Sequence, residues 1–209
     1  MDSAAELKEF CKASGADIAG IADLVPFKEG WVTIPAGILL PYIRAVSVAI
    51  RLDGDIMDAI AELPTEPYAD HYRAVNVALD RLTARIEEWI TCRGNRSEAV
   101  PASKIEDTEK LLGAVSHKAI ARMAGIGWQG KSLLIVNPEH GPRIRLATVL
   151  TDMPLAPDMP IRQRCGSCGE CTKACPAKAI RNVTAMGRYK SREEALVFNR
   201  CADRTYANS

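Results

Sequence analysis

The sequence predicts an α/β (α+β) domain followed by a small cysteine-rich segment. Residues 1–152 alternate helical and strand patterns and hold only two cysteines, whereas four cysteines fall within residues 165–175. Residues 153–164 separate the two parts and include three prolines, which lack a backbone donor and disfavour regular structure. We therefore expect a domain over residues 1–152, a Pro-rich linker over 153–164 and a separate segment over 165–209.

The first half of the domain is predicted to begin with a helix. Ser3 and Glu6 have the spacing of a capping box, and Gly15 is a suitable stop. Strands are expected over residues 16–22 and 45–52, because the second stretch alternates and is rich in β-branched residues. A Pro- and Gly-rich loop separates them. A long helix is expected over residues 68–91, where apolar residues recur at steps of three and four.

The second half is predicted to contain one more helix and two strands. The helix covers residues 115–123, and the strands cover 133–136 and 144–150, joined by turn residues. Beyond the linker, a short helix is expected over residues 177–180. Ser191 and Glu194 have the spacing of a second capping box, which predicts a last helix ending near Cys201.

The composition is that of a globular protein and indicates neither nucleic acid nor a membrane as partner. Of the 209 residues, 47% are hydrophobic and 25% are charged, as in ordinary globular proteins. The formal net charge of +1 gives no indication of nucleic acid or an anionic membrane as partner. No apolar run approaches the roughly 18 residues of a transmembrane helix, and the acidic N-terminus does not resemble a secretory signal. A cytoplasmic location is expected.

The cysteine run predicts an iron–sulfur site. Cys165, Cys168, Cys171 and Cys175, followed by proline, spell C-x2-C-x2-C-x3-C-P, the bacterial ferredoxin pattern. Two-residue spacers let a tight loop turn successive thiolates inward, and the glycines between them let the backbone pass close to a cluster. Structural zinc sites more often use two separated pairs, so zinc is the weaker alternative. We expect a ferredoxin-like segment with one 4Fe–4S cluster.

The fourth ligand of this cluster has two candidates. Cys175 is the simpler choice by sequence, but in two-cluster ferredoxins the cysteine before proline ligates the other cluster. Cys201 is then the only distant cysteine downstream. Cys11 and Cys92 lie among apolar residues of predicted helices, and both are expected to be buried, inert thiols.

A glycine-rich loop joins the helix over residues 115–123 to the next strand. Residues 125–132, GIGWQGKS, match both G-x-G-x-x-G and G-x-x-x-x-G-K-[ST]. Both nucleotide motifs need a strand before the loop and a helix after it, and here the order is reversed. Nucleotide binding is therefore not expected. Lys131, Ser132 and free amides could still hold an anionic or amide group; the alternative is a tight turn with Trp128 packed beneath it.

The order of these motifs resembles the epoxyqueuosine reductase family, and especially its shorter ferredoxin-like relatives. The motifs are SHKA at 116–119, AGIGWQGKSLL at 124–134, PEHGPR at 138–143 and ATVLTDMPL at 147–155, followed by the cysteine run. The resemblance implies an N-terminal domain that cradles cobalamin and a C-terminal part with two 4Fe–4S clusters. It also implies that Lys131 and Ser132 contact the corrinoid and that Tyr68 and His71 lie near another part of its pocket. The alternatives are a solvated lysine, a helix-start tyrosine and a histidine on a helix surface.

The sequence departs from this family at two points. The family's proposed proton-donor Asp corresponds, without gaps, to Leu111 and Leu112, although Asp107 and Glu109 are nearby. The family's later cysteine group has no counterpart before Ser209, and Cys201 resembles the cysteine just before that group. The sequence therefore leads us to expect a single cluster and no completed second one.

Three functions follow from these observations. The first is an iron–sulfur redox protein that passes electrons to a corrinoid or small-molecule acceptor, with an electron donor or acceptor as partner. The second is an enzyme, a cobalamin-dependent oxidoreductase similar to epoxyqueuosine reductase, with tRNA as partner only if that activity is retained. The third is a binding module in which the cluster is structural. His117 and His140 are expected to be surface or hydrogen-bonded residues rather than catalytic ones. The sequence assigns no catalytic residue.

Overall fold

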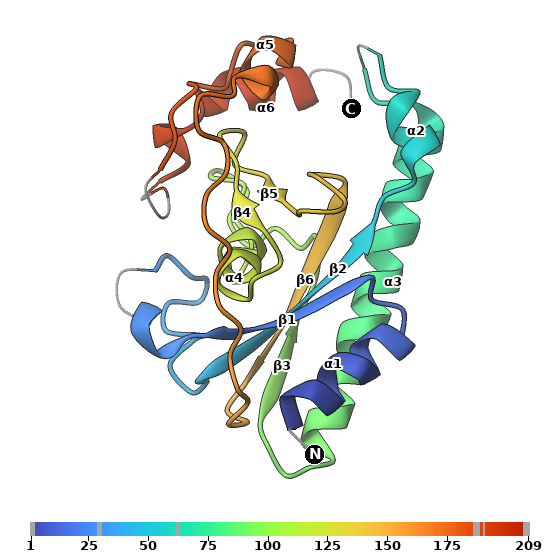
Figure 1. Cartoon of the computed structure of the whole chain (residues 1–209), viewed down its shortest axis with the longest axis vertical. Coiled ribbons are helices and arrows are strands. Elements are labelled where there is room, and N and C mark those ends of the chain that lie inside the picture. Colours follow the sequence, from blue (N-terminus) through green and yellow to red (C-terminus); the bar gives the residue numbers. More distant parts are fainter. Residues whose placement is uncertain (1–2, 29–30, 62, 186–188, 190, 207–209) are drawn as a thin grey trace.

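The computed structural model describes residues 3–28, 31–61, 63–185, 189 and 191–206. At its centre is a four-stranded antiparallel sheet in the order β1-β2-β6-β3 (Figure 1). The strands are β1 (Ile18–Asp23), β2 (Arg44–Arg51), β3 (Ser97–Val100) and β6 (Ile144–Thr151). The predicted mixture of helix and sheet is confirmed, and the antiparallel pairing gives it the α+β form.

Strands β2 and β6 form the centre of the sheet and pair over eight positions, from Arg44 opposite Thr151 to Arg51 opposite Ile144. Most of their residues are buried because both faces of the sheet are covered. Val46, Val48 and Val149 point toward one core, whereas Ala45 and Leu150 point toward the other. Alternate side chains of these strands therefore pack into the two cores on opposite faces of the sheet.

One face of the sheet is covered by α1 (Ser3–Ala13) and the 26-residue helix α3 (Glu66–Thr91) (Figure 1). Thr65 caps α3 by accepting a hydrogen bond from the backbone nitrogen of Tyr68. The apolar stripe predicted from the sequence is buried against the sheet and α1, which explains why this long helix stays in place. Its members are Val75, Leu79, Leu82, Ile86, Trp89 and Ile90.

The other face carries α4 (His117–Met123) and the loop between β1 and β2, which includes the short 3-10 helix η1 (Val25–Phe27). A two-stranded sheet of β4 (Trp128–Gln129) and β5 (Ile135–Val136) lies beside α4. The sequence predicted that residues 133–136 pair with 144–150 as a hairpin. Strand β5 instead pairs with β4, and only the bridge between Asn137 and Gly141 remains at the turn.

The Pro-rich segment 153–164 contains no helix or strand, as expected, but it is anchored to the body along its length. Leu155 is buried in the main core. Asp158 pairs with the edge strand β1, because its backbone nitrogen donates to Ile21 O at 2.8 Å and its carboxylate accepts from Ile21 N at 2.9 Å. Lys8 of α1 donates to the same carboxylate at 2.6 Å. We call this segment the strap (Figure 1).

The C-terminal segment lies over the β4–β5 side of the molecule (Figure 1). It contains α5 (Glu170–Ala174), the 3-10 helix η2 (Arg192–Glu194) and α6 (Phe198–Tyr206). Two predictions were wrong here. The short helix lies inside the cysteine run rather than at 177–180. The last helix spans Phe198–Tyr206 instead of running from Ser191 to near Cys201, and the Ser191 side chain makes no capping bond. Residues 186–188, 190 and 207–209 of the predicted 165–209 segment lie outside the described residues.

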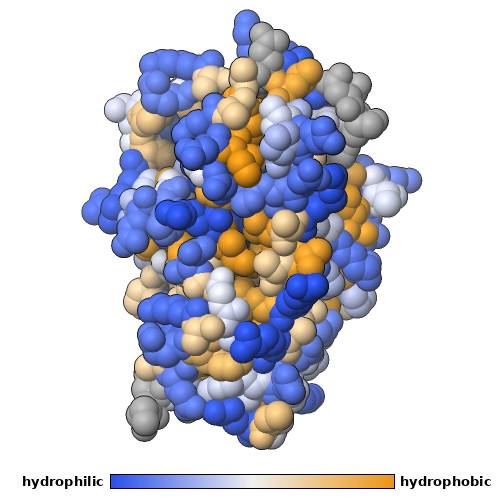
Figure 2. Space-filling model, turned by 90° about the vertical axis from the view of Figure 1, so that its right-hand side faces the viewer, coloured by the Kyte–Doolittle hydropathy of each residue, from blue (hydrophilic) through white to orange (hydrophobic). Residues whose placement is uncertain are grey.

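The surface on the side of α2 (Gly54–Asp58) and α3 is mixed in character. Figure 2 shows hydrophobic residues reaching the surface there between hydrophilic ones. Within the part of the chain that the structure describes, none of the helices has the combination of length and hydropathy needed to span a bilayer.

Candidate functional site

The cysteines of the predicted cluster all carry free thiols. Cys168 is exposed, and Cys165, Cys171, Cys175 and Cys201 are partly buried. The first three cysteines of the run frame the start of α5, and Cys175 follows its end. Outside the run, Cys11 is buried as predicted, and burial raises its pKa to about 12. Cys92 is exposed, so its expected burial was wrong; it follows the last residue of α3, where the helix turns into solvent.

The backbone of the run is turned tightly around its first and last cysteines. Cys168 N donates to Cys165 O at 2.8 Å, with Gly166 between them at a φ of +47°, a conformation that glycine adopts at little cost. At the other end, Ala179 N donates to Cys175 Sγ at 3.4 Å. Amide donors to cysteine sulfur are among the interactions that tune iron–sulfur clusters.

The donor set fits an iron–sulfur cluster in its chemistry, since thiolates are the ligands that such clusters take. Arg200 of α6, the residue before Cys201, donates from Nη1 to Lys178 O at 3.4 Å, so α6 contacts the segment that follows the run. No three Cys, His, Asp or Glu side chains among the described residues are grouped as ligands of a single metal ion. The thiols are therefore present and unpaired, and both Cys175 and Cys201 stay predicted candidates for the fourth ligand.

The glycine loop supports the cysteine run rather than a nucleotide. The loop lies between α4 and β5, as the sequence predicted, and its amides are used internally: Ile126 N donates to Ala121 O, and Gly130 N donates to Leu134 O. Gly127 allows close packing, because a Cβ atom there would lie 2.3 Å from Val136 O. The amides of Ile126 and Gly130 are therefore not available to cradle a phosphate.

Lys131 is the charged residue of this loop, and it is buried, with only 4% of its surface exposed. Its Nζ donates to Cys168 O at 2.6 Å and to Asn182 Oδ1 at 3.0 Å. The lysine motif in the sequence thus contacts the cysteine run directly. Asn182 was not predicted as a site residue. Its φ of +61° lies in the left-handed region, which asparagine adopts more readily than most residues, so its residue type was the one available sequence signal.

Further contacts hold the C-terminal segment on the same loop. Leu133 packs with Tyr189 and Ala195 in a small core of its own. Gln163 Nε2 donates to Gln129 O at 2.7 Å, and the Arg164 guanidinium lies 5.5 Å from the Trp128 ring centre. Burial raises the pKa of Tyr189, and the neighbouring thiolates of the run add to that shift.

The residues implied as a corrinoid pocket lie on two different parts of the fold. Tyr68 and His71 are on the first turns of α3, where His71 Nε2 accepts a hydrogen bond from Asp53 N at 3.0 Å. Within the described residues, no hydrogen bond or ion pair joins Lys131 or Ser132 to this pair. Their role toward a corrinoid therefore stays a prediction.

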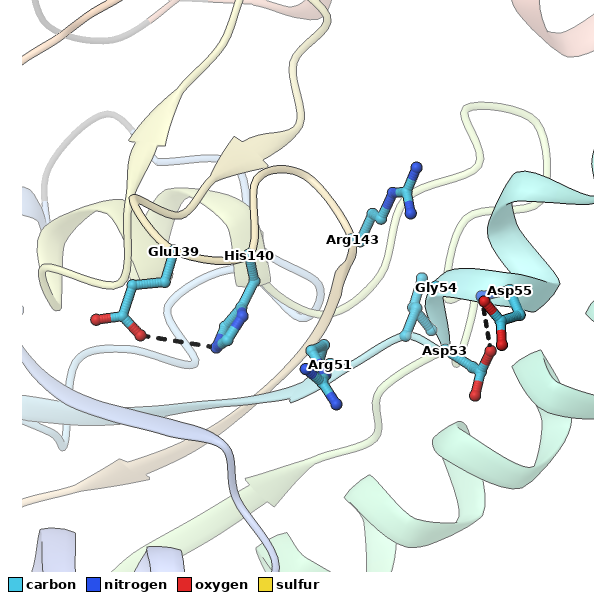
Figure 3. A pocket seen from close by; sticks show the side chains of 8 residues that line it. Arg51, Asp53, Gly54, Asp55, Glu139, His140 and Arg143 are labelled. Atoms are coloured by element: carbon cyan, nitrogen blue, oxygen red, sulfur yellow. Dashed lines mark hydrogen bonds and ion pairs between the residues drawn. The ribbon is translucent and has the colours of Figure 1, made fainter.

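An open cleft of about 430 Å³ lies next to His71. Figure 3 shows Glu139 and His140 from the β5–β6 loop on one side, with Arg51 and the start of α2 on the other. Its lining is mainly charged, and Arg143 of this lining forms an ion pair with Asp58. The sequence predicted His140 as a turn residue without a catalytic role, and it lies 4.0 Å from the Glu139 carboxylate.

A second polar group was missed by sequence reasoning. Arg145 of β6 lies 3.9 Å from the ring centre of Tyr72 and donates to Ser103 Oγ at 2.7 Å. One sequence signal could have revealed it, because Arg145 is a single charge within an apolar strand pattern. Near the proton-donor position, Asp107 only caps a local turn by accepting from Lys110 N, and it bridges to Leu112.

Comparison with known proteins agrees with this fold. No family model matches the sequence. Curated epoxyqueuosine reductases match at 31–44% identity; the Bacillus subtilis protein is 31% identical over 155 residues, which are 69% of this chain and 37% of that protein. These sequence matches thus cover less than half the length of the relatives.

Solved structures give the same result. A structure of epoxyqueuosine reductase from Bacillus subtilis, with a catalytic loop swung out of its active site, has a TM-score of 0.58 and 26% identity, and the match covers 84% of this chain and 52% of that one. A reductive dehalogenase, described in connection with B12-dependent dehalogenation, has a TM-score of 0.65 at 22% identity over 82% and 25% of the two chains, and it shares the fold. The fold and the matches place this chain in a reductase family. It belongs to the epoxyqueuosine reductase-like family.

Proposed function

We propose that this chain is a cytoplasmic iron–sulfur redox protein that passes single electrons through one 4Fe–4S cluster. The observation that carries this proposal is the C-x2-C-x2-C-x3-C-P run with free thiols, held on the glycine loop by Lys131. Cys165, Cys168 and Cys171 would bind the cluster together with Cys175 or Cys201. The seven free cysteines also suit a reducing compartment.

The bound cluster would supply one-electron transfer at a potential set by its charge, hydrogen bonds and exposure. Ala179 N would donate to the sulfur of Cys175, and the tight turn at Gly166 would bring Cys165 and Cys168 to one side of the loop. Exposure of Cys168 leaves one side of the run open to a redox partner. The proposed partner is an electron donor or acceptor, either a protein or a small molecule, and neither a membrane nor nucleic acid is needed.

Anaerobic purification, reconstitution and counting of iron and sulfide test this proposal. We expect about four irons and four sulfides per chain. Comparison of Cys175→Ser with Cys201→Ser identifies the fourth ligand as the one whose loss removes most of the iron, and Cys92→Ser is the matched control because it lies outside the segment. A wild-type chain that takes up no iron under these conditions would falsify the proposal.

A cobalamin-dependent reductase is the second candidate, favoured by the curated relatives and by the open cleft next to His71. In this reading the N-terminal domain would hold the corrinoid and the cluster segment would supply electrons, as an oxidoreductase requires. Cobalamin added to the reconstituted chain should change its absorption spectrum, and His71→Ala should weaken binding. Unchanged spectra at an intact cluster would reject this candidate.

A binding module with a structural cluster is the third candidate. Reduction with dithionite separates it from the first, since a redox cluster bleaches reversibly in the visible range. A cluster that does not bleach, and whose removal unfolds the segment, would favour the structural role.

A further inference from the structure

Lys131 is a buried residue whose ammonium is hydrogen-bonded to neutral oxygens. Its ammonium donates to two neutral oxygens, Cys168 O at 2.6 Å and Asn182 Oδ1 at 3.0 Å, and the side chain is almost fully buried. Among the described residues, no carboxylate forms an ion pair with it. A desolvated charge that meets only neutral acceptors is costly, so the protein must gain something from keeping a lysine here.

The place of this charge is defined by the cysteine run. The carbonyl that accepts from Nζ belongs to the peptide between Cys168 and Gly169. Asn182 lies beside the same peptide, since a Cβ at Gly169 would be 3.7 Å from Asn182 Oδ1. Lysine, asparagine and the loop backbone therefore form one hydrogen-bonded unit beneath the run.

We propose that Lys131 is the positioning residue and the counter-charge of the cluster loop. Its hydrogen bond fixes the Cys168–Gly169 peptide, and its positive charge stabilises the negative charge that collects on the thiolates. This inference rests on the proposed 4Fe–4S function. One-electron reduction adds one negative charge to the cluster, with the electron supplied by the reductant and no proton transferred. A nearby buried cation favours that reduced state and raises the reduction potential.

A tether alone would not need a charge, because a neutral donor can bond a carbonyl without the desolvation penalty of an ammonium. The lysine within the run itself offers a contrast. Lys173 is 75% exposed and pairs with Glu170 in α5, so water and the carboxylate already screen its charge. Lys173 thus provides a matched control on the same segment.

The test compares Lys131→Met, Lys131→Arg and Lys173→Met with the wild-type chain after reconstitution. Iron and sulfide are counted, and the midpoint potential is measured by titration with mediators and dithionite. In Lys131→Met we expect a more negative potential, by about a tenfold change in the one-electron equilibrium constant or 59 mV. Lys131→Arg should stay closer to wild type, and Lys173→Met should not shift. An unchanged potential in Lys131→Met, or an equal shift in Lys173→Met, overturns the proposal.

Hydrogen exchange of the chain without added iron gives a second readout, in case Lys131→Met does not hold a cluster. The amides of residues 165–175 should then exchange faster in Lys131→Met than in wild type, with Lys131→Arg in between and Lys173→Met unchanged. Loss of the cluster with unchanged exchange overturns the proposal. A wild-type chain that binds no iron refutes the proposed function instead, and the exchange comparison then decides whether Lys131 positions the loop.

Discussion

His117 shows how a single polar side chain is accommodated between α4 and the central sheet. Its Nε2 lies 3.2 Å from Pro101 O and its Nδ1 lies 2.9 Å from Thr148 Oγ1. A carbonyl can only accept, so the neutral ring carries its proton on Nε2 and accepts from Thr148 on Nδ1. The prediction that this histidine is hydrogen-bonded is confirmed. Burial also lowers the pKa of His117, because desolvation penalises the charged ring.

This lowered pKa makes stability depend on pH. The unfolded chain binds a proton near the ordinary value of 6.5, while the folded chain binds it only at lower pH. The contribution to stability is therefore complete above about pH 6.5 and is lost as pH falls toward the lowered folded pKa. Urea unfolding at several pH values should show a steeper loss of the free energy of unfolding in wild type than in His117→Gln. His71 and His140 are present in both chains, so equal slopes would count against this assignment.

Other single residues show what the sequence could not provide. The cysteine pattern predicted its four thiols. The burial of a lysine, however, depends on what packs over it, and the partners of Lys131 lie 37 and 51 residues away in the sequence. Cys92 was expected to be buried because its neighbours are apolar. It is exposed because α3 ends just before it. The apolar neighbours of a residue do not determine whether it belongs to the buried face of a helix or lies just beyond the helix end.

At the scale of elements, long periodic segments were predictable and short paired ones were not. The stripe of α3 and the alternation of β2 each bury a continuous surface, so their patterns extend over many residues. Strand β4 has only two residues and β3 only four, and both depend on a partner strand rather than on their own pattern. Strand β5 pairs with β4, whereas β6 pairs with β2 and β3. The backbone of Gly127 lies close to Val136 of β5, and no periodicity encodes that approach.

Gly127 therefore yields a prediction at this scale. In Gly127→Ala the new Cβ would lie 2.3 Å from Val136 O, so either the loop or β5 must shift. We expect a loss of about 1–3 kcal/mol in the free energy of unfolding, as overpacked sites show. Gly54→Ala is the control, since its Cβ would meet Arg143 only at 3.7 Å, and it should change stability little. Thermal or urea unfolding measures both, and an equal effect of the two changes would contradict the argument.

At the scale of the whole molecule, several contacts hold the C-terminal segment on the α+β body. They include the glycine loop with Lys131 and Leu133, the strap, and Arg192 Nη1, which donates to Lys110 O at 2.6 Å. Proline content correctly predicted a segment without helix or strand. It could not predict docking, because Asp158 acts on the edge of β1, and only the folded sheet presents that edge.

The strap gives the last prediction. Asp158→Ala removes the acceptor for Ile21 N and for Lys8 Nζ, leaving a partly buried amide without its partner. We expect a loss of about 1–3 kcal/mol in the free energy of unfolding. Faster cleavage within residues 153–164 should accompany it, measured by limited proteolysis and mass spectrometry. Asp70→Asn is the matched control, because that carboxylate pairs with Arg73 on the exposed face of α3. If cleavage moved to another loop while the strap stayed protected, the remaining contacts at Leu155 and Gln163 would be sufficient to anchor it, and Asp158 would not be the residue that fixes the strap to β1.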